Sequence, residues 1–424
     1  MKINRYDLII LFTFTLLLLG PIYNIGKDVL DLSKFYIAGI PASDIALLIM
    51  LVIFIFNIKQ ITNFTRPKLL GLIGFVIIFY FIQGIIINGT SNFAIYNAEI
   101  RTWFWFYGGI GFAYSLLKTG KPIRYLKMII IVATFLLIVS SIKSEGFTEY
   151  MNGWSTLRVG HQNIYILSGW IVTPIIILLN VTSHKISKMV IPIASIASFF
   201  IFVGIISNTR SSMIIAFVLF LLLSISLKFN IRESVLLISK IRRRDKIILA
   251  ILASLLVVYF VYYNSIERKI RLLSIFDIEV ILSDSRFFEL KSFFGHSDIA
   301  QLFFGRGFGG SVPSPIYEMR LTSTLHIGIL NFWMKLGVFP FLIISYYLFI
   351  NIPARYLKSF KLITHNRSNY YHTANVVILS TLFPWLFSLL LSGGYGETNF
   401  LFAGFTVYAY GMVKKQGLKQ LIKR

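Results

Sequence analysis

Long apolar stretches separated by short polar segments run through the whole chain and predict helices that cross a membrane. Such a helix needs about 20 mainly apolar residues, and stretches of this length recur throughout the 424 residues. The sequence therefore predicts an all-α polytopic membrane protein that forms a single integral membrane domain over 1–424. The twelve predicted spans are 7–25, 42–58, 68–88, 100–118, 125–142, 162–181, 188–206, 211–228, 247–264, 325–350, 373–392 and 397–413.

The distribution of charge orients these spans. The chain is 56% hydrophobic and 14% charged, and its formal net charge is +24. With the amino terminus inside, the inside segments hold 27 of the 41 basic residues and 3 of the 17 acidic ones, so they account for the entire excess. This is the positive-inside bias of membrane proteins. It predicts that both termini are cytoplasmic, and it argues against a nucleic-acid-binding protein.

The sequence gives little support for metal chemistry. It has no cysteine, which excludes a disulfide framework, a thiolate metal site and a cysteine nucleophile. The outward histidines His161, His296 and His326 lack the spacing of a zinc site. We therefore expect neither a metal nor another cofactor.

One large outward loop, 265–324, is the main polar interval between spans. The helix-start cluster at 283–285 predicts a short amphipathic helix that begins near Arg286 and lies on the membrane surface. The glycine-rich segment 305–310 lacks the context of a nucleotide-binding motif. We expect a flexible turn there, at which the backbone and Arg306 approach another group closely.

Several charged residues at the ends of spans are candidates for binding or catalysis. Guanidinium groups clustered in one loop suit phosphate, which they can bind through two hydrogen bonds. Arg210 lies in the tight turn 207–212. Its side chain either extends to the surrounding lipid headgroups or serves as a fixed cation that binds an anionic lipid headgroup. The candidates are Arg158, Arg210, Arg268, Arg286, Arg306, Arg320, His326 and Glu397.

The start of the fourth span has two further features. Glu99 and Arg101 are close enough in sequence to pair with each other, although Arg101 is also a candidate to bind substrate. The aromatic run 103–107 predicts a belt of rings at the lipid headgroups.

In its motifs the chain resembles the O-antigen polymerase and O-antigen ligase superfamily. The matching pieces are the turn Asn-Thr-Arg-Ser-Ser at 208–212, Arg286 within a helix, Gly-Arg-Gly-Phe-Gly at 305–309, His326 and the segment Lys-Leu-Gly-Val-Phe-Pro at 335–340. The Arg-x10-Gly spacing from Arg158 to Gly169 is similar to that of the polymerases. One departure is Ile327, because the family often has asparagine after the histidine.

The resemblance implies a glycosyltransferase of lipopolysaccharide biosynthesis in the bacterial inner membrane, with its active site facing the periplasm. It would join oligosaccharide repeat units linked to undecaprenyl pyrophosphate, and both donor and acceptor would be lipid-linked. We expect Arg210, Arg158, Arg306 and Arg320 to bind the pyrophosphate. Arg286 would assist catalysis there, while His326 or Glu397 would act as the base. Membrane lipid and a chain-length regulator protein are the implied partners.

Three functions remain open at this stage. A polymerase joins repeat units to one another, whereas a ligase transfers the finished polymer to lipid A core. A polysaccharide or lipid transporter is the non-enzymatic alternative, and it predicts charged residues that face each other within the spans.

Overall fold

The computed structural model describes residues 4–18, 36–63, 67–89, 93–126, 285–314, 320–325, 327–364, 370–380, 382–391 and 397–422. All of them belong to one compact unit of the chain. This part of the protein is mostly helical, as the sequence predicts. The predicted spans 162–181, 188–206, 211–228 and 247–264 lie outside the described residues, as does the span 125–142 from residue 127 onward.

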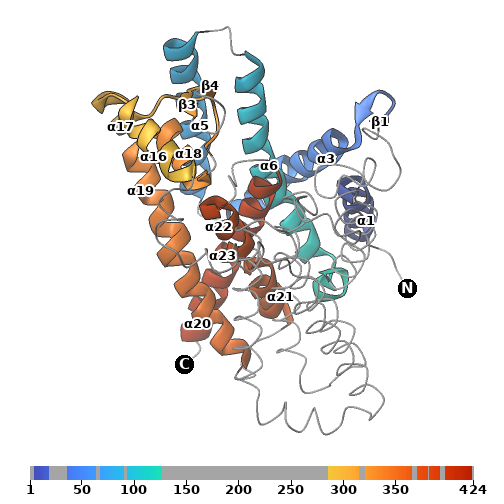
Figure 1. The fold of residues 1–424 in the computed structure, drawn as a ribbon. Coiled ribbons are helices and arrows are strands. Elements are labelled where there is room, and N and C mark those ends of the chain that lie inside the picture. Colours follow the sequence, from blue (N-terminus) through green and yellow to red (C-terminus); the bar gives the residue numbers. More distant parts are fainter. Residues whose placement is uncertain are drawn as a thin grey trace, which may run out of the picture. The chain divides into compact units, whose positions relative to one another are not determined.

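The amino-terminal part contains five helices and one hairpin (Figure 1). The helices are α1 (Arg5–Leu18), α3 (Ala42–Phe56), α4 (Ile58–Thr62), α5 (Pro67–Asn88) and α6 (Phe93–Lys118). Strands β1 (Tyr36–Ile37) and β2 (Ile40–Pro41) pair antiparallel through a two-residue turn. Ala38 and Gly39 in that turn have φ angles of 51° and 79°. Positive φ at both residues is the backbone geometry of a tight hairpin.

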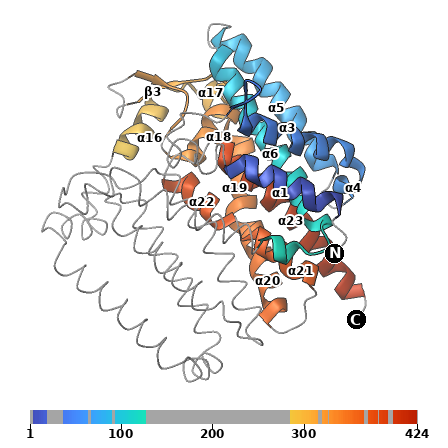
Figure 2. The same cartoon turned by 90° about the vertical axis from the view of Figure 1, so that its right-hand side faces the viewer.

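The carboxyl-terminal part contains two short helices, a hairpin and a series of apolar helices (Figure 2). The elements are α16 (Ser285–Gly295), α17 (Ile299–Phe304), β3 (Val312–Ser314), β4 (Arg320–Thr322), α18 (Gly328–Leu336), α19 (Val338–Tyr346), the π-helix η4 (Tyr347–Asn351), α20 (Ile352–Thr364), α21 (Tyr370–Leu379), α22 (Leu382–Leu391) and α23 (Glu397–Ile422). Helix α16 confirms the amphipathic helix predicted near Arg286.

Two of the described helical segments are long and apolar enough to cross a membrane. They are Leu70–Asn88 in α5 and Val338–Ser359, which runs from α19 through η4 into α20. Only 17% and 11% of the residues in their most apolar windows are buried inside the protein. A core helix of a soluble protein would be mostly buried, so these exposed apolar faces fit lipid better. The twelve-span topology and the sides of the termini remain predictions.

The predicted spans 325–350 and 373–392 are both wrong as single helices. Helix α18 ends at Leu336, and the φ of 78° at Gly337 interrupts the helix before α19 begins. A side chain at Gly337 would collide with the carbonyl of Phe303. The other span is divided between α21 and α22, with a turn at Ser380.

Helix α6 occupies the centre of the described bundle, where it contacts α1, α3, α5, α21 and α23. Its closest neighbour is α23, because Gly109 and Gly404 let the two backbones meet. A Cβ at Gly109 would overlap the carbonyl of Leu401, and one at Gly404 would overlap that of Phe106. Small residues at a helix crossing are typical of helix packing in membranes.

Most of the aromatic run 103–107, in the middle of α6, is packed inside the bundle, contrary to the predicted headgroup belt, and Phe104 alone of the run is exposed. Trp103 and Trp105 are buried, and the Trp103 ring lies 4.8 Å from that of Phe400 in an edge-on arrangement. Tertiary packing against α23 therefore uses side chains that hydropathy alone assigns to the membrane surface.

Substitution of Gly109 by alanine is expected to destabilise the protein, because the added methyl group forces α6 away from α23. Overpacking of this kind costs about 1–3 kcal/mol. Gly71 in α5 is the matched control, since a Cβ there meets no atom within 4 Å. Gly71→Ala should stabilise the helix by roughly 0.5–1 kcal/mol. Thermal unfolding of both variants in one detergent measures the difference, and equal midpoints would contradict the close contact.

Candidate functional site

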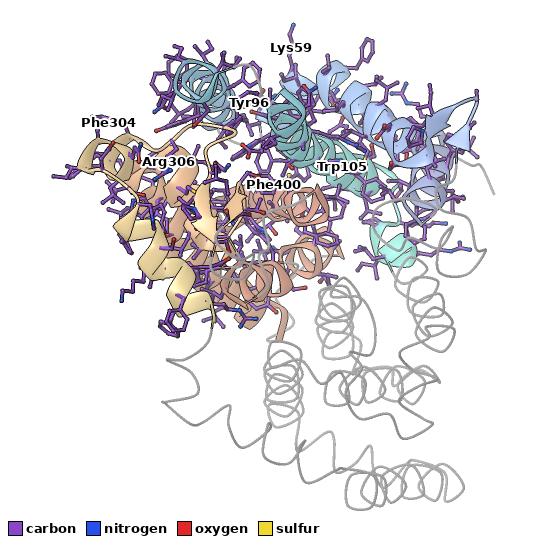
Figure 3. All side chains as sticks on the ribbon, turned by 45° about the horizontal axis from the view of Figure 1, so that its top comes forward. Lys59, Tyr96, Trp105, Phe304, Arg306 and Phe400 are labelled. Atoms are coloured by element: carbon purple, nitrogen blue, oxygen red, sulfur yellow. The ribbon has the colours of Figure 1, made fainter. Side chains whose placement is uncertain are left out.

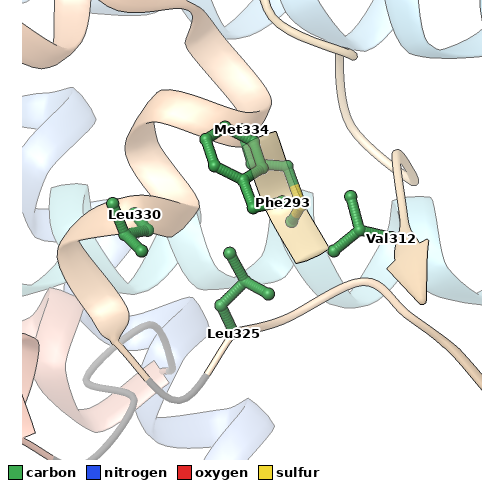
Figure 4. Close-up of a cluster of buried hydrophobic side chains, with 5 residues drawn as sticks. All are labelled: Phe293, Val312, Leu325, Leu330 and Met334. Carbon is green, nitrogen blue, oxygen red and sulfur yellow. The ribbon is translucent and has the colours of Figure 1, made fainter. Parts of the chain in front are cut away.

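The elements between α16 and α18 form a small substructure, which we call the loop subdomain (described residues 285–314, 320–325 and 327–336). Its core is a cluster of five buried apolar side chains, Phe293, Val312, Leu325, Leu330 and Met334 (Figure 4). They come from α16, β3, the segment before α18, and α18 itself. Burial of this cluster fixes the positions of the polar residues around it.

Two of the predicted arginine positions lie in elements of this subdomain that both contact strand β3. Arg286 is in the first turn of α16, and Glu289 follows one turn later. Glu289 is fully buried and accepts a hydrogen bond of 2.8 Å from the Ser314 hydroxyl. Ser314 in β3 pairs in register with Arg320 in β4. Helix α16, which carries Arg286, is thus hydrogen-bonded through Glu289 to β3, and β3 pairs with β4, which carries Arg320.

The segment beside His326 is also held in place. Asn331, fully buried in α18, accepts a hydrogen bond of 2.7 Å from the Leu325 amide and donates one of 3.0 Å to the Leu325 carbonyl. This pair of bonds fixes the residue directly before His326. His326 itself lies outside the described residues.

Hydrogen bonds to α5 and α18 fix the glycine turn 305–310 on both sides. The bonds run from the Arg306 amide to the Met334 carbonyl (2.8 Å), from the Gly307 amide to the Lys335 carbonyl (3.1 Å), from the Phe308 amide to the Tyr80 carbonyl (3.1 Å) and from the Asn88 side chain to the Arg306 carbonyl (3.0 Å). Gly307 has a φ of 70°, and a side chain there would overlap the backbone of Gly84. The predicted close approach is therefore confirmed, and it is made to other parts of the protein.

The Arg306 side chain turns back onto its own loop (Figure 3). Its guanidinium donates to the carbonyls of Ser311 and His296 and to the Ser297 hydroxyl. Partial burial lowers the pKa of Arg306, and the nearby charge of Asp298 opposes that change. These contacts give Arg306 a structural role in closing the turn.

A buried ion pair joins the loop subdomain to α6. The Lys335 ammonium, fully buried near the end of α18, lies 2.6 Å from a Glu99 carboxylate oxygen. Lys335 also donates to the Gly310 carbonyl at 2.8 Å, and the second Glu99 oxygen accepts from the Gly309 amide at 3.0 Å. Both charges are therefore compensated by one another and by the glycine turn.

This geometry corrects the predicted pairing of Glu99 with Arg101. Arg101 instead forms an ion pair with Asp44 of α3, and these two side chains are 39% and 37% exposed. The sequence could not identify Lys335 as the partner of Glu99, because the two residues are 236 positions apart. The available sign of a buried charge was Lys335 itself, a lysine in an otherwise apolar segment.

The structure describes only some of the remaining predicted site residues. Arg158 and Arg210 lie outside the described residues, as does Arg268. Glu397 is the first residue of α23. Within the described ranges, no three histidine or acidic side chains form a group suited to a metal ion.

Comparisons with models of protein families, with curated proteins and with solved structures found no match. The site is therefore interpreted from its own chemistry. Arginine side chains, such as those of Arg286 and Arg320, are suited to binding a phosphate or pyrophosphate group.

Loss of the Lys335 charge is expected to destabilise the protein by about 3–5 kcal/mol, because a buried carboxylate is left without its counter-charge. In the double variant Glu99→Gln/Lys335→Met much of this loss should be recovered, since neutral groups of similar size tolerate burial. The measurement is a cycle of thermal unfolding midpoints for Lys335→Met, Glu99→Gln and the double variant.

The exposed pair of Arg101 and Asp44 provides the control for this cycle. Because both side chains are partly exposed, Asp44→Asn should cost less than about 1 kcal/mol. If the two single losses simply added in the Glu99/Lys335 double variant, the ion pair would not be the stabilising contact.

Proposed function

We propose that this protein is a metal-independent membrane glycosyltransferase of the O-antigen polymerase type. It would join oligosaccharide repeat units carried on undecaprenyl pyrophosphate at the periplasmic face of the bacterial inner membrane. The proposal is supported by the sequence motifs at 208–212, 286, 305–309 and 326 and by the position of Arg286 and Arg320 in two elements that both contact β3.

The proposed reaction forms one glycosidic bond and breaks one sugar–phosphate bond. A hydroxyl of the acceptor sugar attacks the anomeric carbon of the donor, and undecaprenyl pyrophosphate departs with the bonding electrons. The hydroxyl proton goes to a base, for which His326 is the first candidate and Glu397 the second. Arginines stabilise the negative charge that gathers on the departing pyrophosphate.

The packing of α16, which carries Arg286, and of β4, which carries Arg320, against the same strand β3 is the observation on which this proposal mainly depends. The Glu289 carboxylate, hydrogen-bonded to Ser314, connects the first turn of α16 to the strand that faces β4. Transition-state stabilisation requires donors that are held in place before the charge develops. The bond between Glu289 and Ser314 holds α16 against β3 and so fixes the backbone at Arg286 relative to the strand that pairs with β4.

The position of the loop subdomain relative to the apolar helices also fits a lipid-linked substrate. The Gln83 side chain, near the end of α5, donates to the Gly305 carbonyl at 3.1 Å. Helix α19 begins two residues after α18 ends. The subdomain therefore adjoins one end of each helix that is long enough to cross a membrane, and the pyrophosphate of a lipid carrier lies at that level.

Two alternatives remain. An O-antigen ligase would use the same donor and the same arginines, with lipid A core as acceptor. A transporter is favoured by one observation, because Glu99 and Lys335 face each other as buried charges on α6 and α18. Both charges are, however, already bonded to the glycine turn, which suits a fixed structural link better than a mobile charge carrier.

Arg286→Ala is expected to lower polymerisation about 10²–10³-fold, the usual effect of removing one preorganised donor. The test is complementation of a strain that lacks its own polymerase, with lipopolysaccharide separated on a gel at matched membrane expression. The ladder should collapse to core plus one repeat unit. Lys291→Ala, an exposed change on the same helix, should leave the ladder intact.

Each alternative gives a different complementation result. A wild-type protein that attaches polymer to lipid A core in a strain lacking its own ligase, and restores no ladder in the strain lacking its polymerase, would favour the ligase. Normal ladders from Arg286→Ala, Arg320→Ala and His326→Ala together would refute the roles assigned to these residues, whereas a wild-type protein that restores no ladder would refute the polymerase and favour the transporter.

A further inference from the structure

Helix α17 presents an apolar face that the rest of the described chain leaves uncovered. Its six residues include Ile299, which is 77% exposed, and Phe304, which is 64% exposed. Phe303 between them is also exposed. A short polar loop in water gains nothing from exposing two aromatic rings and an isoleucine side by side, and such patches mark interaction surfaces.

The inner side of α17 is firmly attached, so these side chains cannot turn inward. Leu302 packs against the core cluster of the loop subdomain, and its carbonyl accepts a hydrogen bond of 2.9 Å from the Trp333 ring nitrogen. At the start of the helix, Asp298 and Gln301 form reciprocal capping bonds. Figure 3 shows Phe304 pointing away from the neighbouring elements.

The exposed face is continuous with the apolar face of α19, and α17 is also hydrogen-bonded to α5. The ring of Phe303 lies 5.9 Å from that of Phe339, in the first turn of α19. Beyond Phe339, the exposed face of α19 continues through Leu342 and Ile343. On the other side, Gln83 near the end of α5 donates to the Phe304 carbonyl at 3.3 Å. Helix α17 thus lies where the two long apolar helices end.

We propose that α17 is embedded in the boundary between the lipid headgroups and the acyl chains. In that position Ile299, Phe303 and Phe304 extend the lipid-contacting surface of α19 beyond the end of the spanning helix. Aromatic side chains favour this zone of a bilayer. Contact between α17 and lipid does not depend on whether the protein carries out the proposed glycosyl transfer.

The test uses the absence of cysteine from the chain, which allows one spin label per variant without background. The full-length variants Phe304→Cys, Leu342→Cys and Thr324→Cys are labelled with a nitroxide and reconstituted into vesicles of phosphatidylethanolamine and phosphatidylglycerol. Leu342 is the lipid-facing reference on α19, and Thr324 is an exposed polar position of the loop subdomain. Power saturation compares collisions with oxygen, which enriches in lipid, and with a water-soluble nickel chelate.

Labels at 304 and 342 are expected to collide more often with oxygen than with nickel, and the label at 324 should show the reverse. Nickel accessibility at 304 equal to that at 324 would place α17 in water and overturn the proposal. Protection at 304 from both reagents would indicate that protein covers the face and would equally refute lipid contact. A water-exposed label at 342 would overturn it too, since the proposed surface begins on α19.

Discussion

The contact on which the described structure most depends is the buried ion pair between Glu99 and Lys335. Neither charge tolerates burial alone, so each needs the other together with the amide of Gly309 and the carbonyl of Gly310. Those four groups belong to α6, α18 and the glycine turn. The requirement to satisfy two charges therefore fixes a polar loop against the central helix of an apolar bundle.

The glycine turn is hydrogen-bonded to both members of this ion pair, so its position determines the orientation of the loop subdomain. Its backbone lies so close to α5 and α18 that side chains at Gly305 and Gly307 would overlap neighbouring backbone atoms. Helix α17 precedes the turn and β3 follows it, so both leave the anchored segment in set directions. The lipid-facing helix and the arginine-bearing hairpin are thus placed by the same interaction.

The local pattern of apolar and polar residues predicted some elements correctly and failed to predict others. Apolar stretches predicted α3, α5 and α6, and a helix-start cluster predicted α16, because these signals act within a few turns. The break at Gly337 was missed, since nothing in the apolar run around it requires a positive φ. The partner of Glu99 and the alignment of Ser314 with Arg320 were missed because tertiary packing decides them. The sequence singled out Arg286 and Arg320 separately, whereas only the fold relates them.

In the proposed reaction, the lipid-linked pyrophosphate would be bound at one depth only, the level of the headgroups. Arginines that serve it must therefore be held at that level before the substrate arrives, because stabilisation by preorganised charges is lost when the donors have to move. The ion pair anchors the loop subdomain to α6, and the contact of Phe303 with Phe339 ties α17 to the first turn of α19. Two independent attachments of this kind would fix the height of Arg286 and Arg320 relative to the bilayer, which one flexible loop could not achieve.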